Sequence, residues 1–367
     1  MDKKMRAARL HQPGEPLRID RVDVPEIRPH EVLVRVEACG VIPNMNNIFG
    51  GKTWHPLPPM PAIVGLDAAG VIARVGESVT EFAEGERVYV NPLLSCGSCS
   101  YCRRGEPTDC SYAAFRGYFA FTEAAVKLLK EYPYGGFAEY TAAPARNLVK
   151  LPEQVTFEQG ARFGYLGTSY ATLQLAGTRT GTWILINGVT GTLGVGAVTW
   201  ALAMGATRIL GIGRNRDVLA RVGALAARRV FTLALGDEPI GDWVRGHTDG
   251  LGVDVFIDCT GRGSAISTSV EAIGTLKRSG VAVNVSALSE PLAIHPARFM
   301  DSRLTYRGSN WFSVAQGEQI AELVRSGVVD LGHIVPRVYP LESVNDALAE
   351  VKQRPGGFVN IVVAPWK

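Results

Sequence analysis

Short strand-like runs separated by glycine and proline dominate the first 150 residues of the chain. Three clear examples are residues 31–38, 69–75 and 87–90. Runs of this length that end near glycine or proline are typical of β-strands. The pattern therefore predicts a β-rich lobe in the N-terminal part of the chain.

From about residue 164, strand-like apolar runs alternate with helical segments. Alternation of this kind predicts a parallel, doubly wound sheet. The expected strands and helices are 183–186 with a helix to 204, 208–212 with 216–226, 253–258 with 264–273, and a strand at 281–285. The chain then predicts a helix, a strand, a helix and a final strand at 316–326, 335–339, 341–352 and 358–363.

Residues 180–207 carry no charge and are numerous enough to span a bilayer. A short β-rich run in this segment is followed by four glycines, at Gly188, Gly191, Gly194 and Gly196. A strand, a tight turn and a buried helix explain this order better than a membrane span does.

The composition is that of an ordinary globular protein, with 46% hydrophobic residues, 20% charged residues and a formal net charge of +3. These values argue against disorder and against a polybasic surface for nucleic acid or membrane. A length of 367 residues favours two packed domains. The first twenty residues include basic side chains but no apolar run, so we expect no secretory signal and a cytoplasmic protein.

The glycines of the sequence NGVTGTLG have the spacing GxxGxxG, a variant of the dinucleotide fingerprint. The motif follows a predicted strand and opens a predicted helix, a context in which backbone amides bind a pyrophosphate. A glycine-rich turn without a ligand is the alternative. The residues predicted to bind a dinucleotide here are Gly188, Thr190, Gly191, Thr192, Leu193 and Gly194.

Cofactor preference is set after the second strand of this fold, where NAD-binding sites usually place an acid. The chain has Gly213, Arg214, Asn215 and Arg216 there. Two guanidinium groups with no opposing carboxylate favour a 2′-phosphate, so we predict NADP(H). Asp217 is interpreted as a first-turn acid of the next helix. A solvated helix start is the alternative for the two arginines.

Four of the six cysteines, Cys96, Cys99, Cys102 and Cys110, fall within one short stretch. This spacing suits four thiolates around one tetrahedral zinc ion, with disulfides as the competing interpretation. Four sulfur ligands leave no open position, so the predicted zinc is structural. Cys39 and Cys259 are expected to be buried, inert thiols.

These features together resemble the zinc-containing alcohol dehydrogenases of the medium-chain dehydrogenase/reductase family. The resemblance covers nearly the whole chain and includes EVLVRVEACGV, AIVGLDAAGVIARVGESVTEFAEGERVYV, GGFAEYTAAP, VDVFIDCTG and PLESVNDALAEV. It implies an α/β protein with a GroES-like, β-rich catalytic domain and a doubly wound, parallel-sheet (Rossmann) nucleotide domain. The implied catalytic domain is 1–163 plus 309–367, with the zinc lobe at 96–110, and the implied nucleotide domain is 164–308.

The resemblance breaks at the catalytic zinc of these dehydrogenases. The positions that match its ligands read Ile42, Leu66 and, less securely aligned, Gly164, and none of these side chains binds a metal. Asp67 keeps the acidic position beside them. The stretch GVIPNMNN is more similar to the family's zinc-independent quinone oxidoreductases, although Ile42 and Met45 replace the Asn and Asp usual there.

The resemblance also supplies candidate catalytic groups. Asn44 stands where the zinc enzymes keep a hydroxyl for proton relay, and Tyr165 and Thr168 lie in a segment implied to be near the nicotinamide. We therefore take Asn44, Tyr165 and Asp67 as catalytic candidates, and Thr168 and Ser286 as further cofactor contacts. A turn-capping asparagine cluster and a packed aromatic ring are the alternatives for Asn44 and Tyr165.

The segment between Cys110 and Gly135 is rich in aromatic residues: Tyr112, Phe115, Tyr118, Phe119, Phe121, Tyr132 and Tyr134. It predicts either a lid or pocket wall for a bulky substrate, or a subunit contact. Trp54 and His55 are candidates for the same cleft, with a plain surface position as the alternative for His55.

The leading hypothesis is an NADP(H)-dependent oxidoreductase that reduces a carbonyl, or a double bond conjugated to one, in a hydrophobic small molecule. The alternatives are an alcohol dehydrogenase that works in the oxidative direction without zinc, and a catalytically silent NADPH-binding protein. No nucleic-acid or membrane partner is expected. The family resemblance implies a homodimer or homotetramer.

Overall fold

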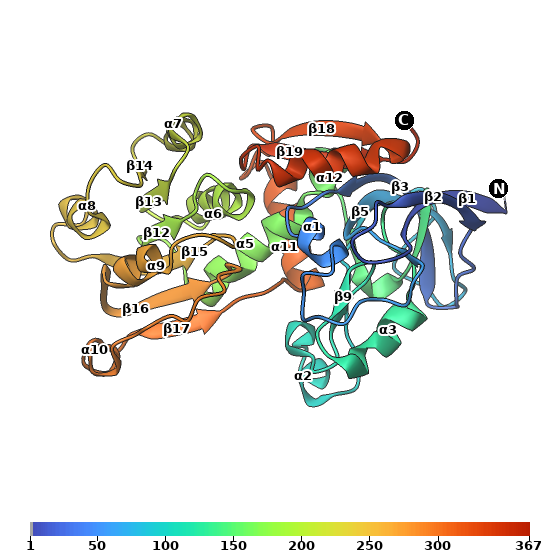
Figure 1. Ribbon diagram of the computed structural model, residues 1–367, viewed down its shortest axis with the longest axis horizontal. Helices are drawn as coiled ribbons and strands as arrows, with labels where there is room; N and C mark the ends of the chain where they lie inside the picture. Colours follow the sequence, from blue (N-terminus) through green and yellow to red (C-terminus); the bar gives the residue numbers. More distant parts are fainter. Residues whose placement is uncertain (1–2) are drawn as a thin grey trace. The chain divides into compact units, whose positions relative to one another are not determined.

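The computed structural model describes residues 3–367, which divide into two compact units (Figure 1). Unit 1 comprises the described part of Met1–Gly164 together with Phe312–Pro355 and Val359–Lys367. Unit 2 comprises Tyr165–Trp311 and the short segment Gly356–Phe358. The chain therefore inserts unit 2 into unit 1 and returns to unit 1 near its C-terminus.

Within residues 3–367, unit 1 is built on one seven-stranded and two three-stranded sheets. The seven-stranded sheet has the order β11-β6-β5-β3-β19-β18, with β10 also paired to β3. Strand β3 is rich in valine and buried at most positions, as a central strand requires. The strands of this sheet and of the sheet β2-β1-β4 are β1 Lys4–Leu10, β2 Arg18–Asp23, β3 Glu31–Gly40, β4 Ala62–Ile63, β5 Asp67–Val75, β6 Arg87–Val90, β10 Tyr140–Pro144, β11 Leu148–Lys150, β18 Val335–Pro340 and β19 Val359–Ala364.

A small lobe of unit 1 carries the cysteines and most of the aromatic segment. Its sheet, β7-β8-β9, joins Leu93–Leu94, Ala114–Phe115 and Phe119–Ala120. Its helical segments are α2 Ser100–Arg103, η1 Pro107–Asp109, η2 Glu123–Ala125 and α3 Val126–Glu131. The lobe has its own core, in which Leu94 and Leu129 pack with small alanines.

The remaining helices of unit 1 are α1 Met45–Phe49, α4 Phe157–Gly160, η3 Ala145–Asn147, α11 Val314–Arg325, η4 Leu341–Ser343 and α12 Val344–Lys352. Reciprocal capping boxes start two of them. Thr156 and Gln159 cap α4, while Ser313 and Gln316 cap α11. Each box satisfies backbone amides that have no helical acceptor, which fixes where the helix begins.

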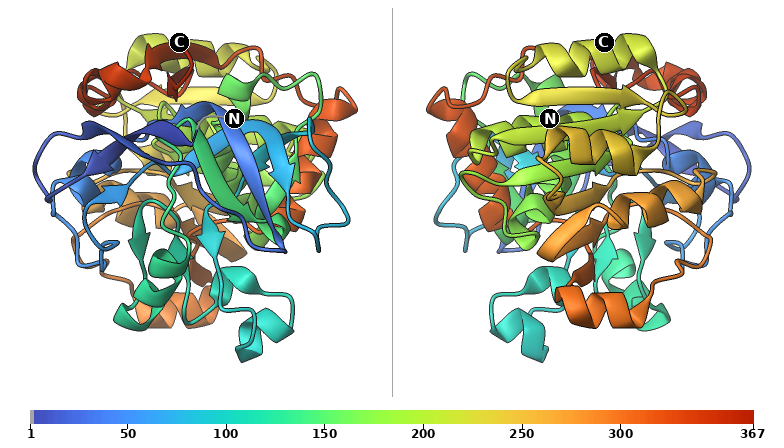
Figure 2. Two further views of the ribbon diagram at one scale, coloured as in Figure 1. Left: turned by 90° about the vertical axis from the view of Figure 1, so that its right-hand side faces the viewer. Right: turned by 90° about the vertical axis from the view of Figure 1, so that its left-hand side faces the viewer.

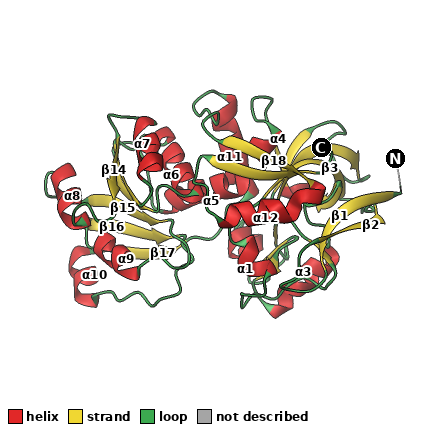
Figure 3. Ribbon diagram, turned by 45° about the horizontal axis from the view of Figure 1, so that its top comes forward, coloured by secondary structure: helices red, strands yellow, loops and turns green. Residues whose placement is uncertain are grey.

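Unit 2 contains, among the described residues, a six-stranded parallel sheet of order β14-β13-β12-β15-β16-β17. Figure 2 (right) views the molecule from the side of this unit. Helices flank the strands (Figure 3). The strands are β12 Trp183–Asn187, β13 Arg208–Gly213, β14 Val230–Ala234, β15 Val253–Asp258, β16 Leu276–Asn284 and β17 Thr305–Gly308. The helices are α5 Phe163–Leu175, α6 Thr192–Ala203, α7 Arg216–Ala224, α8 Ile240–His247, α9 Ile266–Ile273 and α10 Pro296–Ser302.

The strand order reverses between β12 and β15. From β12 the chain moves outward to β13 and β14, and it then returns to build β15, β16 and β17 on the other side. In open sheets of this kind, ligands bind beyond the carboxyl ends of the strands at the reversal. The register pairs Asn187 with Asp258, so β12 and β15 end at the same level.

Most expected elements agree with the structure to within a few residues, and the sequence 180–207 forms β12, a turn and α6 as expected. None of the helices in the described part of the chain has the length and apolar character needed to cross a bilayer. The pattern missed several elements, among them β14, α8, α10 and β17. It also placed the start of β16 at residue 281, whereas the strand begins at Leu276.

Candidate functional site

The glycine motif forms a tight loop between β12 and α6. Gly188 has a φ of +76°, and the amide of Gly191 donates to the Gly188 carbonyl at 2.9 Å. A Cβ at Gly194 would stand 2.5 Å from Val189 Cα, so only glycine fits there. Helix α6 begins at Thr192, and its first amides present partial positive charge without a helical acceptor. This is the geometry with which helix starts bind a pyrophosphate.

Helix α5 supports this loop through α6. Ser169 Oγ on α5 donates to the carbonyl of Leu193 at 2.8 Å. Thr168 is buried on the same helix, and Tyr165 is half-buried in its first turn. Both candidates from α5 therefore belong to the helix that packs against the start of α6.

The end of β13 is shaped by close packing. A Cβ at Gly213 would lie 2.8 Å from Thr190 Cγ2, so the strand end and the glycine loop touch at this point. Asn215 caps α7, because its Oδ1 accepts from the Val218 amide at 3.1 Å. Asp217 lies in the first turn of α7, as expected.

Arg214 and Arg216 are both exposed but differ in their partners. Arg216 Nη2 forms an ion pair with Asp237 Oδ1 at 2.5 Å, and this contact holds the pKa of the Asp237 carboxyl below its ordinary value. The expectation that no carboxylate opposes the two guanidinium groups is therefore wrong for Arg216. Within residues 3–367, Arg214 has no ion pair. Asp237 follows β14, the strand that the sequence pattern did not reveal.

Ser286 and Cys259 lie just beyond the carboxyl ends of β16 and β15. Ser286 Oγ donates to Asn284 Oδ1 at 2.5 Å, which holds the side chain at the strand end. Burial raises the pKa of the Cys259 thiol, and it does the same for Cys39 in β3. A raised thiol pKa favours the neutral, unreactive form expected for both, although Cys39 is buried as expected and Cys259 is only partly buried.

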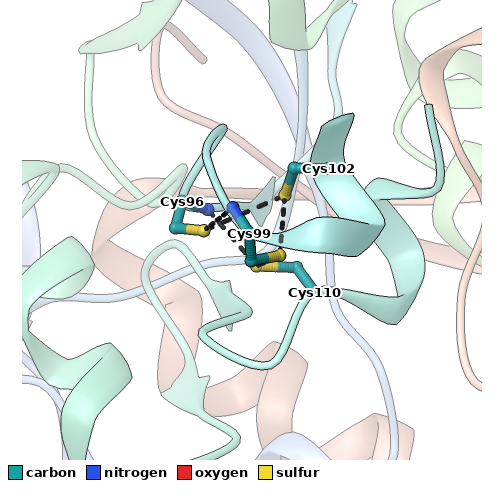
Figure 4. Close-up of side chains that lie close together, drawn as sticks. All are labelled: Cys96, Cys99, Cys102 and Cys110. Atoms are coloured by element: carbon teal, nitrogen blue, oxygen red, sulfur yellow. Dashed lines mark hydrogen bonds between the residues drawn. The ribbon is translucent and has the colours of Figure 1, made fainter. Parts of the chain in front are cut away.

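The four clustered cysteines point toward one another in the lobe (Figure 4). Their Sγ atoms all lie within 4.8 Å of one another, with Cys96–Cys102 at 4.0 Å, Cys99–Cys102 at 3.5 Å and Cys99–Cys110 at 3.8 Å. Four sulfurs at the usual zinc–sulfur distance would be about 3.8 Å apart at the corners of a tetrahedron. The Cys99 amide also donates to Cys96 Sγ at 3.3 Å, a contact that orients the sulfur. The donor set therefore fits zinc.

The positions that would hold a second, catalytic zinc are packed with apolar groups and backbone. Ile42 and Leu66 are buried. Gly164 lies directly against Asp67, since a Cβ at Gly164 would overlap the Asp67 carboxylate. Across residues 3–367, the four-cysteine cluster is the one group of three or more His, Cys, Asp or Glu side chains close enough to hold a metal ion.

Asp67 is almost fully buried, with 1% of its surface exposed. Tyr89 on β6 donates its hydroxyl to Asp67 Oδ1 at 2.7 Å. Burial raises the Asp67 pKa to about 7, against the lowering effects of the Tyr89 hydrogen bond and the Arg162 charge. A carboxyl in this position does not meet solvent, and the catalytic role of Asp67 stays a prediction. Sequence reasoning overlooked Tyr89, which looked like an ordinary strand residue.

Asn44 stands at the start of α1 in unit 1. Its Oδ1 accepts from Asn47 Nδ2 at 3.1 Å, while Asn46 Nδ2 donates to the Leu348 carbonyl of α12 at 3.0 Å. Asn44 is the N-cap residue of α1, but its side chain makes no capping hydrogen bond to the helix backbone, so the turn-capping alternative does not describe its contacts. Among the described residues, Asn44 Nδ2 has no hydrogen-bond partner, so its two protons remain available as donors.

The aromatic segment is used mainly inside unit 1. Four of its rings are buried, at Phe115, Tyr118, Phe119 and Tyr132, and Tyr112 is exposed. The imidazole of His55 stacks on Phe119 with ring centres 4.1 Å apart, so His55 is half-buried and not a plain surface residue. Burial lowers its pKa. Trp54 beside it is 80% exposed.

Two models of known protein families match this chain, one mainly in unit 1 and one mainly in unit 2. Residues 28–153 match the family described as alcohol dehydrogenase GroES-like domain, and residues 192–326 match the one described as zinc-binding dehydrogenase. L-threonine 3-dehydrogenase of Pyrococcus horikoshii is 30% identical over 277 residues, which are 74% of each chain. The chain belongs to the medium-chain dehydrogenase/reductase family.

Two other relatives match different lengths of this chain. An alcohol dehydrogenase of Geobacillus stearothermophilus is 36% identical over 189 residues, so the chain spans about half (52%) of that relative's length. A quinone oxidoreductase of Lama guanicoe is 28% identical over 378 residues, covering 98% of this chain and 97% of the relative.

Among solved structures, a putative zinc-binding dehydrogenase from Sinorhizobium meliloti 1021, bound to NADP, superposes with a TM-score of 0.84. The match covers 99% of this chain and 100% of that protein at 24% identity. At that identity the likeness supports the shared fold, a GroES-like domain with a Rossmann domain.

Proposed function

We propose that this medium-chain dehydrogenase/reductase is an NADP(H)-dependent oxidoreductase that reduces a carbonyl, or a carbonyl-conjugated double bond, without a catalytic zinc. The observation that carries the proposal is the replacement of the three ligand positions by Ile42, Leu66 and Gly164. Gly164 cannot be exchanged for a ligand without displacing the buried Asp67 carboxyl. The substrate oxygen must then be polarised by side-chain donors.

The glycine loop and the start of α6 are the residues that would hold the cofactor's pyrophosphate. Arg214 would pair with the 2′-phosphate of NADP(H), and no acid occupies Gly213 to repel it. Arg216 would share its charge between that phosphate and Asp237. The NADP bound to the relative from Sinorhizobium meliloti supports the same choice. We therefore expect Arg214 to contribute more to the preference than Arg216.

A bound nicotinamide supplies or accepts a hydride. The chain must then stabilise the negative charge that develops on the substrate oxygen and provide a proton. Asn44 Nδ2 can donate a hydrogen bond to that oxygen, but an amide is no practical proton source. The Tyr165 hydroxyl can donate a proton, and solvent is the other source. These roles fit a conjugated acceptor, because hydride addition at its β-carbon spreads charge into an enolate.

The zinc of the cysteine lobe would take no part in this chemistry. Cys96, Cys99, Cys102 and Cys110 supply four ligands, which leaves no position for a substrate. A metal in such a closed site contributes to folding of the lobe.

Steady-state kinetics on a panel of acceptors test the proposal. The wild-type protein is assayed with NADPH on an enone, a quinone and an aldehyde, and with NADP⁺ on simple primary alcohols. We expect conjugated acceptors to be reduced faster than alcohols are oxidised, because no metal stabilises an alkoxide. Asn44→Ala should lower the rate by about a hundredfold to a thousandfold, the range for loss of an oxyanion donor.

Asn46→Ala is the matched control, because it breaks the contact from α1 to α12 but leaves Asn44 in place. It should retain most of the activity. Oxidation of simple alcohols with no activity on conjugated acceptors would overturn the proposal in favour of an oxidative alcohol dehydrogenase. Tight NADPH binding without turnover of any acceptor would favour a silent NADPH-binding protein.

A further inference from the structure

Three residues from the C-terminal part of the chain lie on the glycine loop of unit 2. We call Gly356, Gly357 and Phe358 the C-terminal strap. The amide of Gly357 donates to the carbonyl of Thr190 at 2.9 Å. Immediately after the strap the chain enters β19 of unit 1, so the strap is the last part of the chain that belongs to unit 2.

The contact is close enough to require glycine. A Cβ at Gly357 would overlap the Gly191 carbonyl oxygen and a methyl group of Val195. Gly356 has a φ of +97°, a conformation that other residues rarely adopt, and packs against Val218 of α7. Two adjacent glycines therefore let the strap backbone lie directly on the loop backbone.

The strap is also anchored away from the loop. Phe358 is buried, and the guanidinium of Arg221 on α7 lies 4.2 Å from the centre of its ring. A cation over an aromatic face is attracted to it. The strap therefore contacts both α7, which begins with the phosphate-binding candidates, and the loop before α6.

The strap supplies one of the hydrogen bonds that the backbone carbonyls of the glycine loop accept. The Gly188 carbonyl accepts from Gly191, the Gly191 carbonyl from Val195, and the Thr190 carbonyl from Gly357. A carbonyl oxygen turned toward a pyrophosphate would repel it, whereas one engaged elsewhere leaves the amides of the helix start to face the anion. One of these three donors comes from the strap.

We infer that the C-terminal strap is a positioning element for the dinucleotide, with Gly357 holding the Thr190–Gly191 peptide in its anion-binding orientation. The inference rests on the proposed function for the identity of the ligand as a nicotinamide dinucleotide. It does not depend on which dinucleotide is preferred, because NADPH and NADH share the pyrophosphate.

The test uses Gly357→Ala in the full-length protein, titrated with NADPH and with NADH by nicotinamide fluorescence. Both dissociation constants should rise by about tenfold, as expected for loss of one well-placed hydrogen bond. The KM for NADPH should rise while kcat changes little. In the ligand-free protein, amide hydrogen exchange in residues 188–194 should become faster.

Gly246→Ala is the matched control, since a Cβ there meets no atom within 4 Å and the residue also belongs to unit 2. It should leave both dissociation constants unchanged. If Gly357→Ala does not fold, Gly356→Ala is compared with Gly181→Ala, whose φ of +90° imposes a similar strain before β12 and whose Cβ would meet no atom within 4 Å. Only the first should weaken dinucleotide binding.

Unchanged affinity in the strap variants, or a weakening matched by their controls, would overturn the inference. Equal binding of NADPH and NADH by the wild type would count against the proposed cofactor preference alone. In that case a parallel loss of both affinities in Gly357→Ala would still support the strap.

Discussion

Asp67 should make folding stability depend on pH in a way that one substitution removes. Burial raises its pKa from 3.8 to about 7. Between these two values the folded state binds more protons at this site than the unfolded state does, so its contribution to stability falls as pH rises. Above about pH 7 the full cost of the buried carboxylate is present and constant.

The size of this effect follows from the difference between the two pKa values. About three units correspond to about 4 kcal/mol in total, at 1.36 kcal/mol per unit. Most of it, about 3 kcal/mol, should be lost between about pH 5 and about pH 8. Asp67→Asn has nearly the same shape, stays neutral throughout, and can still accept from Tyr89. The free energy of unfolding of this variant should therefore lack the part of the pH dependence that comes from Asp67.

Urea unfolding of wild type and Asp67→Asn at several pH values measures the two free energies of unfolding. Their difference isolates the effect of Asp67, because the other titrating groups are the same in both proteins. The advantage of the variant over wild type should grow by about 3 kcal/mol between about pH 5 and about pH 8. Asp301→Asn on the surface of α10 is the control and should show no such change. A difference that stays flat across this range would refute the assignment of a buried carboxyl that is protonated near neutral pH.

Three further results are expected. Arg214→Ala should remove most of an NADPH preference of about tenfold to a hundredfold in titrations of both cofactors, whereas Arg216→Ala, whose partner is Asp237, should remove less. Tyr165→Phe should lower kcat for enone reduction if its hydroxyl supplies the proton, and an unchanged solvent isotope effect on kcat would assign the proton to another donor. Cys110→Ser should release zinc and lower the unfolding temperature. A variant that keeps its zinc and the unfolding temperature of the wild type would contradict a structural four-sulfur site.

The sequence predicted those parts of the fold whose signal is local. The strand before Gly188 and the helix after it carry no charged residue and are mostly apolar, and the GxxGxxG spacing places a turn between them. The cysteine spacing likewise brings four sulfurs together within one short loop. In both cases the residues that make the feature are close in the chain.

The parts that sequence reasoning missed depend on contacts between distant residues. All four residues of β17 are exposed, so no apolar pattern marks that edge strand. Asp237 becomes a partner of Arg216 only when β14 pairs with β13. Gly356 and Gly357 resemble any surface turn until the fold places them on Thr190. Asp67 and Tyr89 meet because β5 and β6 are neighbours in the sheet.

The central claim is that side-chain donors polarise the substrate and that the only zinc lies in the cysteine lobe. Elemental analysis of dialysed protein that reduces a conjugated acceptor with NADPH tests it most directly. The account predicts one zinc per chain, held by Cys96, Cys99, Cys102 and Cys110. Two zinc ions per chain in the active protein would contradict it.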